Sequence, residues 1–533
     1  MSLARLWAIR KGLGCVLLAP LPLFATAAET IETESTAALA NETVGKTETV
    51  VISIPQGELQ GTTSERNSSI AVFKNIPYAL PPVGQRRFRP AETAADWEGA
   101  RLAIDFSPAC LQPPYPSDSF FARAATPTSE DCLYLNVWAP RLYETTKPSD
   151  PLPVMVWIHG GGLTRGSGSS SIYDGAGLAA KGVVLVTINY RLGVFGYMAH
   201  PEASAESSAG VSGNYGTSDQ IAALKWVKRN IAGFGGDPNN VTIFGESAGS
   251  WSVHHMLATP KAKGLFHKAI GQSGARFGRM APLRGDASSG HAQGVKLQTV
   301  LGAKSLAQLR ELDGATVLAA SQQMRFHEVF DGEVFPEQLY EMFAKHRYNV
   351  VPLMVGYNAD EATVFGGLEN YPPSADAYKA ELQKRFGDFS GALLKHYPAD
   401  DPKNSSLRLS RDTLFGHGMH TWARLNAQKE KDTYFYYFTH EPLGKPWGAF
   451  HAAEIAYAFD NVEQDEALSS LMSDYWVAFA RTGKPEVEGA TKWPRYSIKK
   501  PLHLEFSAEG ATRGRNSLGK RFSTLDKLSA SRR

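Results

Sequence analysis

The chain has 533 residues and a formal net charge of +2, with 43% hydrophobic and 20% charged residues. This composition is that of an ordinary globular protein. Its basic residues form no dense run beyond Arg86, Arg87 and Arg89, which argues against a nucleic-acid partner. No apolar stretch reaches the ~18 to 20 residues that span a bilayer, which argues against a membrane partner. The length admits two or three average domains or one large α/β domain.

The N-terminal residues 1–27 are typical of a signal peptide. Arg5, Arg10 and Lys11 give a basic start, residues 12–24 are mostly apolar, and residues 25–27 are the small residues that a signal peptidase accepts. The apolar part is short and interrupted by prolines, which disfavours a membrane anchor. We therefore expect a secreted or periplasmic protein.

Residues 28–49 are rich in Thr, Ala and Glu and show no apolar periodicity. They predict a disordered leader before a single catalytic domain at residues 50–533. Removal of the signal peptide leaves Cys110 and Cys132 as a pair in a compartment where disulfides persist. Closing the loop between them would contribute about 3 kcal/mol in the chain-entropy model.

Short, continuously apolar segments predict buried strands at residues 154–158, 183–188 and 241–244, and a weaker one at residues 352–355. Between the second and third, apolar residues recur at helical spacing over residues 221–230, and a Gly-rich turn follows. Buried strands that alternate with helical segments indicate an α/β fold, with a mostly parallel central sheet flanked by helices.

A run of glycines follows the first of these strands. His159 is succeeded by Gly160, Gly161 and Gly162. Consecutive glycines let backbone N–H groups approach a reacting carbonyl without side-chain obstruction, as an oxyanion hole requires. We expect the N–H groups of Gly161 and Gly162, together with that of Ala248, to stabilise such an oxyanion.

Gly245-Glu246-Ser247-Ala248-Gly249 follows the strand at residues 241–244 and precedes a segment able to be helical. A serine on a sharp strand-to-helix bend needs small residues two positions away on either side, because its backbone packs closely against its neighbours. The bend exposes the hydroxyl and directs the N–H groups of the new helix at the reacting centre. The pattern predicts that Ser247 is a nucleophile.

A serine hydroxyl needs a base to accept its proton and an acid to orient that base. In this kind of fold the chain order is serine, acid, histidine. Asp360 and Glu361 follow the strand near residue 355, and the residues alone do not separate them as the acid. The C-terminal half contains His327, His346, His396, His417, His420, His440, His451 and His503. His451 is the favoured base, because small and apolar residues flank it on both sides.

Together these motifs resemble the type-B carboxylesterase and cholinesterase family of α/β-hydrolases. The resemblance extends from Gly57 to about Tyr496. Its further matching segments are Phe234-Gly235-Gly236-Asp237-Pro238, Glu130-Asp131-Cys132-Leu133-Tyr134-Leu135-Asn136, Ile76-Pro77-Tyr78-Ala79, Asn189-Tyr190-Arg191-Leu192-Gly193, Gly213-Asn214-Tyr215-Gly216 and Trp493-Pro494-Arg495-Tyr496.

This resemblance implies a serine hydrolase that cleaves small-molecule carboxylic esters through an acyl-enzyme and needs no cofactor or metal. By similarity Glu361 is the acid and His451 the base, Ser273 supports them by hydrogen bonding, and Cys110 pairs with Cys132. An unperturbed histidine base of pKa ~6.5 predicts a rate that falls below about pH 6. A monomer or small homo-oligomer is the default expectation.

The sequence departs from the family's pattern where the acyl pocket is expected. Arg165 lies just after the glycine run, and Arg276 and Arg279 follow Ser273. Arginines there could bind substrate carboxylates, which favours an esterase for polycarboxylate esters such as those of fumonisin-type toxins. They could equally be surface arginines paired with local acids. A non-catalytic binding module of the cholinesterase type is disfavoured, because the candidate serine, acid and histidine are all present.

Overall fold

The structure is a computed structural model that describes residues 47–115, 121, 126–141, 150–365, 371–429, 431–515 and 519–532. The predicted signal peptide and almost all of the predicted leader lie outside the described residues. Only residues 47–49 of the leader are described, and the first strand already begins at Thr49.

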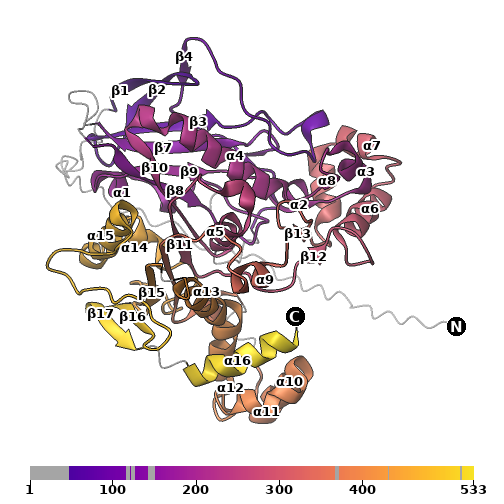
Figure 1. Ribbon diagram of the computed structural model, residues 1–533, viewed down its shortest axis with the longest axis vertical. Helices are drawn as coiled ribbons and strands as arrows, with labels where there is room; N and C mark the ends of the chain where they lie inside the picture. Colours follow the sequence, from indigo (N-terminus) through magenta and orange to yellow (C-terminus); the bar gives the residue numbers. More distant parts are fainter. Residues whose placement is uncertain are drawn as a thin grey trace, which may run out of the picture. The chain divides into compact units, whose positions relative to one another are not determined.

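The centre of the fold is a sheet whose middle strands run parallel (Figure 1). These strands are, in spatial order, β9 (Val184–Ile188), β8 (Leu152–Ile158), β10 (Gly236–Glu246), β11 (Lys268–Gln272), β14 (Leu353–Asn358), β15 (Thr433–Phe438) and β16 (Leu502–Ser507). Strand order and chain order differ at β9 and β8. This arrangement confirms the predicted α/β class.

Antiparallel strands extend the sheet at both edges. On one side lie β1 (Thr49–Ile54), β2 (Gly57–Thr63), β3 (Ile70–Pro77) and β7 (Tyr134–Pro140), with β4 (Ala100–Leu102) paired to β2; on the other lies β17 (Gly510–Arg515). Two short pairs stand apart, β5 (Ala109–Cys110) with β6 (Thr128–Ser129) and β12 (Ala281–Pro282) with β13 (Val329–Phe330).

Alternate side chains of the central strands enter two separate cores. In β8, Val154, Val156 and Ile158 belong to one core, and Met155 and Trp157 belong to the other. Side chains of successive strand residues point to opposite faces, so a continuously apolar strand is buried on both. Helices α4 (Tyr215–Asn230), α5 (Ala248–Ala258) and α13 (His417–Ala427) supply the first core, and α1 (Ala176–Ala180), α14 (Ile455–Ala458) and α15 (Glu466–Thr482) supply the second.

The remaining α-helices lie in the connections between strands, except α16, which follows β17. They are α2 (Gly193–Tyr197), α3 (Pro201–Glu206), α6 (Gly290–Val300), α7 (Leu306–Glu311), α8 (Gly314–Ser321), α9 (Leu339–Ala344), α10 (Ala375–Phe386), α11 (Ser390–Leu394), α12 (Pro402–Arg411) and α16 (Gly519–Ser531). A π-helix, Asp412–Gly416, joins α12 to α13. No helix in the described part of the chain is both long and apolar enough to cross a membrane.

The predicted strands and the predicted helix all form, but β10 starts earlier than expected. It begins at Gly236 rather than Val241, because Gly236 already pairs with Leu152 of β8 before the register shifts at Val241. The Gly-rich segment that ends α4 therefore also contributes the first residues of the strand.

Candidate active site

Ser247 stands between the end of β10 and the start of α5. Its backbone has φ 55° and ψ −121°, a conformation that residues with side chains rarely adopt. The Ser247 N–H donates a hydrogen bond to the carbonyl of Gln272 in β11, at 2.9 Å. The bend is thus fixed to the neighbouring strand, and the serine lies at the carboxyl edge of the parallel strands.

The two glycines of this bend pack against the end of β8. A Cβ atom on Gly249 would lie 2.0 Å from the carbonyl oxygen of Ile158, and one on Gly245 would lie 2.6 Å from the same oxygen. Real Cβ atoms do not approach a backbone oxygen so closely. The small residues on either side of Ser247 are therefore required by this close contact between β8 and the bend.

His451 is buried, and its ring contacts carboxylates on both nitrogens. Its Nδ1 donates to Glu361 Oε2 at 2.5 Å. The other Glu361 oxygen accepts the N–H of Asn358 at 2.8 Å. Asp360 instead accepts the N–H of Ala449 at 3.0 Å. The structure thus separates the two acids that the residues alone left open, and it is Glu361 that contacts the histidine.

The second nitrogen of His451 has a partner that the sequence reasoning missed. His451 Nε2 forms an ion pair with Glu246 Oε1 at 3.1 Å. Glu246 directly precedes Ser247, so this contact joins the imidazole to the residue next to the serine in the chain. Among the described residues the Ser247 hydroxyl has no side-chain hydrogen-bond partner. The one signal of this contact in the sequence is the acidic residue inside the bend.

Burial and charge act in opposite directions on these groups. Burial lowers the pKa of His451, but the carboxylates of Glu246 and Glu361 outweigh it and raise that pKa to about 9. Burial raises the pKa of Glu246, and the charge of His451 opposes this. The pKa of Glu454, which accepts hydrogen bonds from Asn358 at 2.6 Å and Gln272 at 3.2 Å, is also raised by burial. The carboxyl groups that act on His451, those of Glu246, Glu361 and Glu454, are therefore all buried with it.

Aromatic rings enclose the imidazole. The ring centroids of Phe415, Phe365 and Phe121 lie 4.6, 4.9 and 6.4 Å from that of His451. Phe365 is also half exposed to solvent, so it lies where a substrate could reach it. These rings limit the access of water to the His451 imidazole and leave an apolar surface next to it.

The glycine run after β8 forms a tight turn beside the bend. Gly161 has φ 99° and Gly162 has φ 66°, and the Gly161 carbonyl accepts the N–H groups of Thr164 and Arg165 at 3.2 and 3.0 Å. As the first residue of α5, Ala248 has an N–H without a partner inside the helix. The expected donors therefore belong to backbone that bends next to Ser247.

The buried side chain of His159 contacts this turn and helps to fix it. Burial lowers the pKa of His159 to about 4, so the ring is neutral, and its Nδ1 lies 2.8 Å from the carbonyl of Gly160. The Tyr190 hydroxyl donates to the His159 carbonyl at 2.8 Å, and the two rings stack at 4.4 Å. These contacts make the turn part of the folded core.

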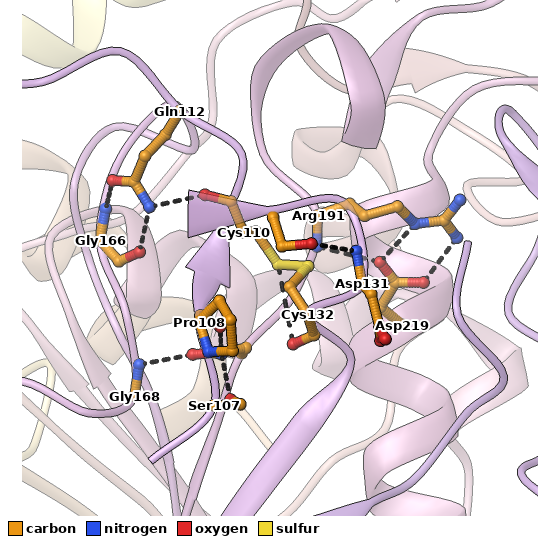
Figure 2. The surroundings of a disulfide bond; sticks show 12 residues. Ser107, Pro108, Cys110, Gln112, Asp131, Cys132, Gly166, Gly168, Arg191 and Asp219 are labelled. Atoms are coloured by element: carbon orange, nitrogen blue, oxygen red, sulfur yellow. Dashed lines mark hydrogen bonds and ion pairs between the residues drawn. A yellow bond between two sulfur atoms is a disulfide. The ribbon is translucent and has the colours of Figure 1, made fainter. Parts of the chain in front are cut away.

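A disulfide joins Cys110 to Cys132, as the sequence predicts, and its segment is hydrogen-bonded to Gly166, just after this turn (Figure 2). Gln112 donates to the carbonyls of Cys110 and Gly166 at 2.9 and 2.8 Å and accepts the Gly166 N–H at 2.7 Å. The crosslinked segment therefore braces the loop that follows the glycine run.

Ser273 directly follows β11, the strand next to the bend. It has φ 51°, its N–H donates to the Gly356 carbonyl at 2.9 Å, and its hydroxyl is buried without a hydrogen-bond partner among the described residues. The predicted supporting hydrogen bond is not present in this arrangement. A buried hydroxyl without a partner still leaves Ser273 available to a water or a substrate group.

The candidate arginines differ in their surroundings. Arg276 pairs with the buried carboxylate of Glu328 at 3.5 Å and lies over the Trp251 ring at 4.9 Å. Arg165 lies over the Tyr115 ring at 5.4 Å, and its Nε donates to a backbone carbonyl at 3.2 Å. Among the described residues Arg165 has no carboxylate partner. Arg279 is exposed and follows Arg276 in the same loop.

Most of the other histidines lie apart from this site. His417 pairs with Asp526 at 2.9 Å, His420 with the Tyr496 hydroxyl at 3.0 Å, and His440 with Asp465 at 2.6 Å. Across the described segments, no group of three His, Cys, Asp or Glu side chains is arranged as a metal ion would need.

A mostly parallel sheet that carries a serine on a strand–turn–helix bend at its carboxyl edge is the architecture of the α/β-hydrolase class. The profile of the Carboxylesterase family matches residues 48–523. The chain is 36% identical over 480 residues to a fumonisin B1 esterase of Sphingopyxis macrogoltabida, covering 85% of this chain and 86% of that protein. It is 36% identical over 479 residues to the para-nitrobenzyl esterase of Bacillus subtilis (strain 168), covering 84% and 92%.

A solved structure of a PNB esterase matches with a TM-score of 0.76 at 33% identity, covering 89% of this chain and 99% of that one. The protein belongs to the carboxylesterase family, and it is a carboxylic ester hydrolase whose substrates are small-molecule esters.

Proposed function

We propose that Ser247, His451 and Glu361 are the catalytic triad of this esterase. The observation that carries the proposal is the position of His451, whose one nitrogen bonds Glu361 while the other lies 3.1 Å from the residue that precedes Ser247. Glu361 holds the imidazole orientation and stabilises its charged form. For catalysis, Nε2 is unprotonated, and the Ser247 hydroxyl replaces Glu246 as its partner.

In the first half of the reaction His451 takes the proton of Ser247 as its oxygen forms a bond to the ester carbonyl carbon. The negative oxygen is stabilised by the N–H groups of Gly161, Gly162 and Ala248, each worth about 3 kcal/mol of barrier. The bond to the alcohol oxygen breaks, and His451 returns the proton to it. A water molecule then attacks the acyl-enzyme by the same sequence and releases the acid.

The experiment that tests the nucleophile is covalent labelling by an organophosphonate, followed by intact mass. The wild-type protein gains one phosphonyl group, and peptide mapping places it on Ser247. Ser247→Ala gains none. Undiminished labelling of Ser247→Ala at another residue would contradict the assignment.

A specialisation for polycarboxylate esters is a second candidate. Arg165 favours it, since this guanidinium follows the glycine run and has no carboxylate partner among the described residues. The relative whose name is fumonisin B1 esterase favours it too. Arg276 favours it less, because Glu328 already neutralises its charge. The carboxylate-binding role therefore centres on Arg165.

Export from the cytoplasm is part of the proposed function. It is supported by the basic, apolar and small-residue pattern of residues 1–27 and by the disulfide between Cys110 and Cys132. N-terminal sequencing of protein secreted by its own host tests it, with a mature terminus near residue 28 expected. A mature chain that starts at Met1 would contradict export by cleavage.

A further inference from the structure

The π-helix Asp412–Gly416 connects the histidine to distant parts of the fold. Its residue Phe415 is buried and lies 4.6 Å, centroid to centroid, from the His451 ring. Phe365 stacks on Phe415 at 5.8 Å and also contacts His451. A π-helix turn carries an extra residue and forms less readily than an α-helix turn, so it persists where its surroundings hold it. Phe415 therefore depends on whatever fixes this turn.

Asp412, the first residue of the π-helix, anchors this turn. Its carboxylate is fully buried, accepts Arg411 Nε at 2.8 Å and the Tyr397 hydroxyl at 2.8 Å, and forms an ion pair with Arg521 Nε at 2.6 Å. Arg521 comes from α16, near the C-terminus. Two hydrogen bonds and an ion pair to this buried carboxylate hold the backbone of the π-helix in one place.

Arg411 extends the network to the acid of the site. Its NH1 group donates to the carbonyl of Ala359 at 3.1 Å, two residues before Glu361. The same ion-pair cluster thus touches the loop that carries Glu361 at one end and, through Phe415, the His451 ring at the other. The Asp412 cluster therefore contacts the surroundings of both Glu361 and His451, the two partners of the histidine–carboxylate hydrogen bond.

We propose that Asp412 is a positioning residue for catalysis: with Arg411 and Arg521 it fixes the π-helix that keeps Phe415 against His451. The proposal rests on His451 acting as the base. Asp412 touches no reacting atom. Its effect is on the fraction of molecules in which the imidazole has its productive orientation, and misplacement of a catalytic group costs rate rather than substrate binding.

The test is Asp412→Asn, which keeps the shape of the side chain and removes its charge. We expect kcat on a neutral p-nitrophenyl ester to fall at least about tenfold, with KM within about twofold. We expect the proton between His451 Nδ1 and Glu361 Oε2 to give a downfield NMR signal in wild type, and this signal should broaden or vanish in the folded variant.

Asp219→Asn is the matched control. Asp219 is a fully buried carboxylate near the Cys110–Cys132 disulfide (Figure 2), and it binds Arg191 through both oxygens, at 2.8 and 2.6 Å. Its loss should lower the thermal midpoint without lowering kcat or changing the downfield signal. If Asp412→Asn does not fold, Arg521→Gln removes the same ion pair from α16, where the side chain is 13% exposed, and a smaller fall in kcat is expected.

A double-mutant cycle decides whether the effect passes through Phe415. If it does, Asp412→Asn in a Phe415→Ala background lowers kcat by less than about twofold further. If the losses of kcat caused by Asp412→Asn and by Phe415→Ala multiply in the double variant, the effect does not pass through Phe415. A kcat within twofold of Asp219→Asn in both Asp412→Asn and Arg521→Gln would overturn the proposal. Organophosphonate labelling of Ser247 in these variants separates this failure from a failure of the triad.

Discussion

The two halves of the site are built in different ways. The serine half consists of the ends of adjacent strands and the turns that directly follow them, where Gly249 leaves no room for a Cβ atom against Ile158. The histidine half is assembled from loops far apart in the chain: His451 and Glu361 are separated by 90 residues, and Phe415 comes from a third segment. Rigid strands fix Ser247, whereas hydrogen bonds and ring contacts fix His451.

The largest expected effect on stability comes from a substitution in the serine half of the site. Gly249→Ala would place a methyl group 2.0 Å from a backbone oxygen, and we expect a loss of about 3 kcal/mol or more in the free energy of unfolding, measured by urea denaturation. Gly278→Ala is the matched control, since nothing lies within 4 Å of its added Cβ atom. Equal stability of the two variants would show that the bend is not packed as described.

A substitution at Glu246 sharpens the account of the histidine half. The pKa of His451, about 9, lies above its ordinary value of 6.5 because the charges of Glu246 and Glu361 and the hydrogen bond to Glu361 outweigh the effect of burial. The base must be neutral, so kcat/KM of wild type should rise with pH toward about 9, rather than level off above pH 6 as an unperturbed histidine predicts. Glu246→Gln should move this acidic limb to lower pH, because it removes one of the charges that raise the pKa of His451. A limb that stays in place would contradict the described ion pair.

The same pKa has a consequence for stability. A pKa raised on folding contributes stability that is fully present below pH 6.5 and is lost as the pH rises through about 9. Differential scanning calorimetry of wild type and Glu246→Gln between pH 6 and 10 should show a smaller decline for the variant. Parallel declines would show that the Glu246–His451 contact does not stabilise the fold.

The smallest expected effect concerns substrate preference. Arg165→Ala should lower kcat/KM about tenfold on a tricarboxylate ester while leaving a neutral ester nearly unchanged, since one charge-assisted hydrogen bond contributes about 1.5 kcal/mol. Arg276→Ala should discriminate less, because Glu328 neutralises Arg276. Equal losses on both esters in Arg165→Ala would remove the polycarboxylate proposal.

The sequence predicts the serine half far better than the histidine half, for a physical reason. The close packing around Ser247 requires glycines at fixed spacing, and the buried strands require continuous apolar runs, so both leave local patterns. The choice between Asp360 and Glu361 depends on how two distant loops meet, and only resemblance favoured Glu361 beforehand. The contacts of Glu246 and Asp412 leave no pattern beyond a single acidic residue.

Arg165 and Arg276 also show that contacts between distant segments cannot be predicted from a local sequence pattern. Arg165 and Arg276 are equivalent as sequence signals near the expected acyl pocket. They become different when Glu328, 52 residues after Arg276, is found against one of them. A charge in the sequence therefore predicts a binding role only after its buried partners are known.

The most direct test of the central claim, that Ser247 is activated by a histidine that Glu361 orients, is kcat of Glu361→Gln and Asp360→Asn on one p-nitrophenyl ester. Glu361→Gln should lose about 10³- to 10⁴-fold, as expected when the histidine loses its orienting carboxylate. Asp360→Asn should lose less than about tenfold, because an amide oxygen can still accept the Ala449 N–H. The reverse order of losses would contradict the account.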